Sequence, residues 1–158
     1  MSISMKQSLP ILCIAILVSA CASTGLPRED RLALYRENAG EPIPNFRSTS
    51  RNLSWRALSD DALVVWTRSN QANLLEFNPR CIGLRSARTI YISNSRGLVS
   101  AQFDSVRIIA PATATRPQLS CRITTIRPLD LQAINDSKRE LREAQIMQIE
   151  DDASEQQP

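Results

Sequence analysis

Short apolar segments recur about every ten residues between Phe46 and Arg127, a spacing common in small all-β domains. Residues 62–67 are β-branched and almost continuously apolar, which is typical of a central strand covered on both faces. The pattern predicts five to seven strands in a mainly β fold, a small antiparallel barrel or sandwich. The expected strands are 53–57, 62–67, 73–77, 89–93, 98–103, 106–109 and 121–126, with a loop at 111–117.

Two segments outside this region favour helix, and a length of 158 residues suits a single domain. One short helix is expected at 28–38, and a longer one follows Asp130 as N-cap. The acidic, polar end of the chain is predicted to be disordered. The expected organisation is a signal peptide at 1–20, a tether with a short helix at 21–45, a β-domain at 46–130, an amphipathic helix at 131–149 and a disordered tail at 150–158.

The N-terminal apolar run ends in Leu17-Val18-Ser19-Ala20-Cys21, which resembles the signal of bacterial lipoproteins. The run from Leu9 to Ala20 is shorter than the ~20 residues that a membrane-spanning helix needs. The resemblance implies cleavage before Cys21 and lipid on its thiol and amine. Ala22, rather than Asp, indicates the periplasmic face of the outer membrane. The alternative is a short buried helix with a chance cysteine.

The cysteine count predicts one disulfide. Of four cysteines, Cys13 would leave with the signal and Cys21 would carry lipid, so Cys81 and Cys121 remain. In an oxidising periplasm they are expected to pair and to close a loop of about 40 residues. The alternatives are two separate buried thiols or a redox pair, although a Cys-X-X-Cys spacing is missing. Two cysteines without any histidine also make a poor zinc site, so no metal is expected.

The β-region contains Trp55, Leu58, 64–67, 73–75, Cys81, Leu84, Gly97, Phe103, Asp104, 121–123 and 126–130. Together these residues resemble a family of small bacterial secreted proteins and lipoproteins that is catalogued only as a domain of unknown function. The resemblance covers 46–130 and implies one domain with a Cys81–Cys121 pair. It implies no reaction, substrate or catalytic residue.

Charge is unevenly distributed along the chain. Residues 46–127 hold twelve arginines, no lysine and four acids, a net charge of +8, whereas 128–158 have three cations and eight acids, a net charge of −5. The two parts could attract each other.

The arginines indicate a surface for phosphates or carboxylates, with lipid head groups or cell-wall carboxylates as partners rather than nucleic acid. The alternative is that these arginines only occupy solvent-facing strand positions and have no binding role. The candidate binding residues are Trp55, Trp66, Arg122 and Arg127, the tryptophans being best interpreted as core or sheet-face residues.

The sequence contains no recognisable catalytic constellation. Without histidine there is no Ser-His-Asp or Cys-His arrangement, and four glycines are too few for a phosphate-cradling loop. We therefore expect that the protein is not an enzyme and uses no cofactor. It is expected to be a membrane-anchored binding or structural module of the cell envelope. The alternative is a small-ligand or glycan-binding module, or an accessory periplasmic enzyme. A deep pocket lined by Trp and Arg would favour the ligand module, and a flat apolar patch or strand edge would favour a protein partner.

Overall fold

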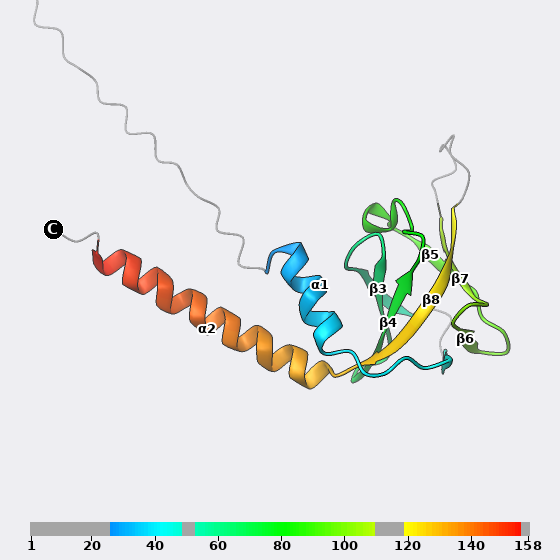
Figure 1. Ribbon diagram of the computed structural model, residues 1–158, viewed down its shortest axis with the longest axis horizontal. Coiled ribbons are helices and arrows are strands. Elements are labelled where there is room, and N and C mark those ends of the chain that lie inside the picture. Colours follow the sequence, from blue (N-terminus) through cyan, green and yellow to red (C-terminus); the bar gives the residue numbers. More distant parts are fainter. Residues whose placement is uncertain (1–25, 49–52, 110–118, 156–158) are drawn as a thin grey trace, which may run out of the picture.

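The computed structural model describes residues 26–48, 53–109 and 119–155. The predicted signal peptide and Cys21 lie outside the described residues. Within them, eight strands form two antiparallel sheets, one of them a half-barrel, and two α-helices accompany the sheets, which confirms the predicted mainly β class (Figure 1). The elements are α1 (Arg28–Glu37), β1 (Asn45–Arg47), β2 (Ser54–Ala57), β3 (Ala62–Arg68), β4 (Gln71–Phe77), a 3-10 turn (Leu84–Ser86), β5 (Ile90–Ile92), β6 (Leu98–Ser100), β7 (Ser105–Ile108), β8 (Ser120–Leu129) and α2 (Leu131–Glu155).

The larger sheet has the strand order β2-β3-β4-β8-β7-β5, and β1 pairs with β6 in the smaller one. The expected strands 62–67 and 73–77 correspond to β3 and β4, which pair as an antiparallel hairpin with Ala62 opposite Glu76. The described residues contain eight strands instead of the expected five to seven. The additional strand is β1, whose three residues follow Pro44 and carry too little alternation to be seen in the sequence.

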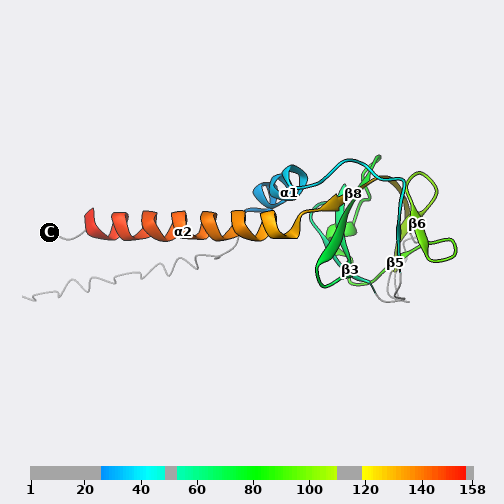
Figure 2. The same cartoon turned by 90° about the horizontal axis from the view of Figure 1, so that it is seen from below.

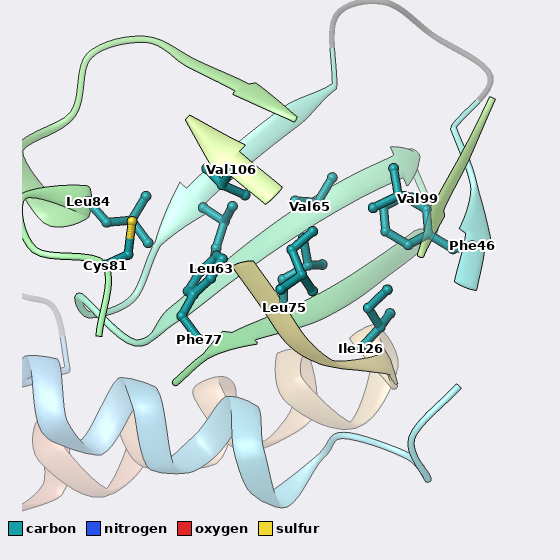
Figure 3. Packing of buried hydrophobic residues seen from close by; sticks show 11 residues of the cluster. Phe46, Leu63, Val65, Leu75, Phe77, Cys81, Leu84, Val99, Val106 and Ile126 are labelled. Carbon is teal, nitrogen blue, oxygen red and sulfur yellow. The ribbon is translucent and has the colours of Figure 1, made fainter. Parts of the chain in front are cut away.

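The sheet is apolar on both faces. Leu63 and Val65 of β3 point into an inner cluster with Leu75, Phe77 and Ile126 (Figure 3). Val64 and Leu74 point the other way, into a helix-side cluster with Leu34 and Tyr35 of α1 and Ile134 of α2. The continuous apolar run in β3 is therefore explained, because each buried Leu or Val side chain contributes about 1.5–3 kcal/mol on either face.

Strand β8 holds the two ends of the sheet together. It pairs with β4 over most of its length and with β7 only at Ser120–Arg122. Pro128, which has no N–H to donate, lies beyond the end of β7. There the chain that follows α1 approaches: Gly40 N donates to Pro128 O and Ile43 N to Ile126 O, both at 2.8 Å.

Helix α1 is part of the folded body. Leu34 and Tyr35 are buried, and the Arg36 guanidinium binds Glu76 Oε1 at 2.9 Å and Asp61 Oδ2 at 3.4 Å. The short helix expected at 28–38 corresponds to α1, and it packs on the sheet, whereas we expected it to lie within a tether at 21–45. Only residues 22–25 therefore separate Cys21 from the described part of the chain.

Helix α2 begins as predicted but runs further. Asp130 Oδ1 accepts hydrogen bonds from the backbone N–H groups of Gln132 and Ala133, both at 3.0 Å. Ile134 is buried, whereas every residue from Arg139 to Ile149 is exposed, and α2 projects away from the sheets (Figure 2). The expected disordered tail at 150–158 is helical as far as Glu155, because no glycine or proline interrupts 131–157.

The predicted disulfide between Cys81 and Cys121 is confirmed. The Cα atoms are 5.5 Å apart and 40 residues apart in sequence. Cys81 is fully buried in the inner cluster, and its N–H donates to Asp60 O at 2.6 Å. The bond therefore ties the loop after β4 to the start of β8.

Reducing this disulfide should lower the free energy of unfolding by about 4 kcal/mol, the chain-entropy value for a closed loop of 40 residues. Urea unfolding of the protein with and without reductant measures the difference. The variant Cys81→Ala/Cys121→Ala serves as control, since reductant should leave its midpoint unchanged. An unfolding midpoint of the wild type that does not respond to reductant would contradict the prediction.

Asp61→Asn should destabilise the protein at neutral pH but not in acid. The hydrogen bond that Ser59 Oγ donates to Asp61 lowers the carboxyl pKa below 3.8, and Arg36 adds to this effect while burial opposes it. A lowered folded pKa gives stability that is present above the unfolded value and is lost as the pH falls through the folded value. Because both partners are partly exposed, the loss at pH 7 should stay below about 1 kcal/mol.

Chemical denaturation of Asp61→Asn and wild type between pH 2 and 7 tests the difference, over a range that spans the ordinary carboxyl pKa of about 3.9. The exposed Glu41, whose side chain forms no hydrogen bond or ion pair within the described residues, provides the control variant Glu41→Gln. A difference between Asp61→Asn and wild type that persists at the acid end would refute the linkage.

Candidate functional site

The two tryptophans lie on opposite faces of the sheet. Trp55 pairs with Val65 and packs against the inner cluster, whereas Trp66 pairs with Ser54 and packs against the helix-side cluster. Both are half-buried. The arrangement matches their interpretation as sheet-face residues, and it does not bring them together as one aromatic platform.

The two candidate arginines, both on β8, differ in their contacts. Arg122 is exposed, and its side chain forms no hydrogen bond or ion pair within the described residues. Arg127 is half-buried and donates to three carbonyl oxygens at the end of α1: Gly40 O and Ala39 O at 2.9 Å, and Arg36 O at 3.3 Å. A cation is favourable at a helix C-terminus, where carbonyl groups lack partners. Arg127 therefore fastens α1 to the sheet, and its guanidinium is already engaged.

Three surface grooves differ in charge. One is lined by two cations, Arg36 and Arg80, and by two acids, Asp61 and Glu76, so its formal charges balance, and Arg36 forms ion pairs with both acids. A second is bordered by Arg47 and Arg68 together with neutral polar residues. The third has a volume of about 350 Å³ and four cations but no acid; we call it the cationic groove, and it is lined by Leu26, Arg31, Arg56, Lys138, Leu141, Arg142 and Gln145.

Three elements that are distant in the sequence form the cationic groove. Arg31 comes from α1, Arg56 from the edge strand β2, and Lys138 and Arg142 from α2. The groove exists because the first turns of α2 and helix α1 both cover the helix-side cluster, and this brings them next to each other (Figure 1).

Two of the four cations are held in place. Arg31 Nη2 donates to Leu26 O at 3.1 Å. Lys138 Nζ donates to the Tyr35 hydroxyl at 3.1 Å and lies 5.0 Å from the centre of the Tyr35 ring. The three ion pairs among the described residues, which involve Arg36 and Arg139, include none of the four. No carboxylate of this part of the chain therefore forms an ion pair with the four cations of the groove.

The sequence did not single out these four residues. Arg56 is one of the twelve arginines of 46–127, but Lys138 and Arg142 belong to the acidic segment 128–158, which could attract that region. No ion pair joins the two parts within the described residues. The spacing of Lys138, Leu141, Arg142 and Gln145 on one side of a helix was the available signal.

Other site types are not found in the described ranges 26–48, 53–109 and 119–155. No three His, Cys, Asp or Glu side chains gather there as metal ligands would. Nor does this part of the chain contain a helix long and apolar enough to cross a membrane.

Arg127→Met should destabilise the protein by about 2 kcal/mol, because it removes charged hydrogen bonds to three backbone carbonyl groups. Arg122→Met on the same strand is the matched control and should change stability by less than about 0.5 kcal/mol. Urea unfolding of both variants measures the contrast. Equal stabilities would show that Arg127 does not fasten α1.

Comparison with known proteins gives a family but no characterised relative. A family of unknown function, DUF6491, matches residues 4–145. No curated protein and no solved structure matches the chain. The matched range extends beyond 46–130 at both ends and takes in α1 and the inner half of α2. The chain belongs to DUF6491, a family of unknown function.

Proposed function

We propose that this protein is a lipid-anchored, non-enzymatic binding or structural module at the periplasmic face of the bacterial outer membrane. The Cys81–Cys121 disulfide carries the proposal. Disulfides persist in oxidising compartments such as the periplasm and are rare in the cytosol, so the bond supports export. It also uses both cysteines that follow Cys21, which leaves Cys21 as the lipid-bearing residue of the lipoprotein-like signal.

Lipid on Cys21 would give lasting membrane attachment. Each buried methylene group contributes about 0.8 kcal/mol, so one acyl chain gives reversible binding and several give stable anchoring. Residues 22–25 are then the whole link between the anchor and the described part of the chain. A short link favours a domain that works close to the membrane surface.

The absence of histidine from the sequence supports a binding or structural role rather than catalysis. The cationic groove favours an anionic component of the envelope as partner, with an envelope protein as the other candidate. A small-ligand or glycan module is less favoured. Trp55 and Trp66 lie on opposite faces of the sheet, and neither lines any of the three grooves described above.

Cys21→Ser should release the protein from membranes, because it removes the thiol that would be acylated. Membrane fractionation and metabolic labelling with a palmitate analogue measure attachment and acylation. Cys13→Ser is the matched control within the same apolar segment and should remain labelled and membrane-bound. Palmitate incorporation by Cys21→Ser equal to that of the wild type would refute the anchor.

A further inference from the structure

The cationic groove concentrates like charge without an internal counter-charge. Four cations line a volume of about 350 Å³, and no lining residue is acidic. Like charges repel each other most where solvent access is reduced, and Arg31 and Lys138 are both half-buried. An anion in the groove would relieve this repulsion, so the site is suited to a negatively charged group.

The groove is also partly preorganised. The hydrogen bond from Arg31 to Leu26 O and the contacts of Lys138 with Tyr35 hold two cations before any ligand arrives. Ordering side chains on binding costs free energy, so side chains that are already ordered strengthen binding. Arg56 and Arg142 are exposed at the groove and can present guanidinium N–H groups, which match phosphate oxygens in pairs.

The covalent chain limits how far the groove can lie from Cys21. Leu26, which lines the groove, follows Cys21 by five residues. A fully extended chain spans at most about 3.6 Å per residue, so their Cα atoms lie within about 18 Å of each other whatever the conformation between them. If Cys21 carries lipid, the groove therefore stays near the head groups of that membrane.

We propose that the cationic groove binds the phosphate of anionic phospholipid head groups and so orients the domain on the membrane. The inference rests on the proposed function for its choice of ligand, because lipid on Cys21 places head groups within reach. Leu26 and Leu141 line the same groove, and exposed Ile146 lies one turn beyond Arg142 on α2. Apolar side chains beside cations are typical of helices that bind the membrane interface.

A second copy of the chain is the competing occupant, because the last turns of α2 carry Glu150, Asp151, Asp152 and Glu155 in sequence. The lipid is favoured because α1 and β2 contribute to the groove as well as α2, and because Leu26 keeps it close to Cys21. A pairing of α2 helices alone would not require Arg31 or Arg56.

The test uses a chain that begins at Ala22, which contains every described residue and the Cys81–Cys121 pair but no acylated cysteine. Co-sedimentation is measured with vesicles of phosphatidylcholine, with and without phosphatidylglycerol. The wild type should bind only the anionic vesicles, at millimolar lipid. Arg56→Gln/Arg142→Gln should bind about 25-fold more weakly, since each cation near an anionic surface contributes about fivefold.

Arg85→Gln/Arg88→Gln is the matched control. It removes the same charge at two exposed arginines that do not line the groove, so its vesicle binding should change by less than about twofold. Both double variants should unfold thermally at the same midpoint temperature as the wild type, which would verify that their fold is intact.

Three results would overturn the proposal. The first is equal vesicle binding by Arg56→Gln/Arg142→Gln and Arg85→Gln/Arg88→Gln. The second is binding of inorganic phosphate by the wild type, measured by calorimetry, without groove-dependent binding to the anionic vesicles, which would identify free phosphate as the ligand. The third is a groove variant that loses self-association in sedimentation equilibrium while vesicle binding is kept, which would identify a second copy.

Failure of the groove proposal can be distinguished from failure of the proposed lipid anchor at Cys21. The test chain lacks residue 21, so vesicle binding does not depend on acylation. If Cys21 of the full chain incorporates palmitate but the chain that begins at Ala22 shows no preference for anionic vesicles, the proposed function stands without the groove. If the shortened chain shows a groove-dependent preference but Cys21 of the full chain incorporates no palmitate, the groove stands without the anchor.

Discussion

The two-sided burial of the sheet through β3 and β4 is the constraint on which the rest of the structure depends. Residues 62–65 are all fully buried, so neither face of β3 can remain in water. The inner face is covered by the curling of the sheet and by the β1–β6 pair, whose Phe46 and Val99 join the same cluster. The other face is covered by α1 and the start of α2, which lie on it.

Strand β8 connects the elements that cover the two faces of the sheet. At its start Cys121 is bonded to the loop after β4, and at its end Asp130 caps α2. Between them Ile126 enters the inner cluster, while Arg127 reaches the opposite face and binds the carbonyl end of α1. One strand therefore positions both helices relative to the sheet.

The cationic groove is a consequence of this arrangement. Helices α1 and α2 meet because both cover the helix-side cluster, and the groove forms where their outer sides meet the edge strand β2. A requirement of core burial thus gathers Arg31, Arg56, Lys138 and Arg142, none of which lies in the core. Sites assembled in this way are common at the junctions of packed elements.

Much of the fold follows from local sequence patterns. Alternating or continuous apolar residues define the strands from β2 to β8, and Asp130 defines the start of α2. Both signals are local, because the alternation of side chains along a strand and the capping of a helix involve only residues close in the sequence. The Cys81–Cys121 pair could be predicted because two cysteines remain after the signal, and one bond needs two.

Only the tertiary structure decided what depends on contacts distant in sequence. It made α1 part of the domain by burying Leu34 and Tyr35, separated Trp55 from Trp66 by the sheet, and gave Arg122 and Arg127 different environments on one strand. It also brought the cations of α2 to Arg31 and Arg56. The lipoprotein-like signal ending at Cys21 belongs to the sequence alone, because a peptidase and an acyl transferase read a short linear motif. A groove has no such motif, since its residues become neighbours only when the core is buried.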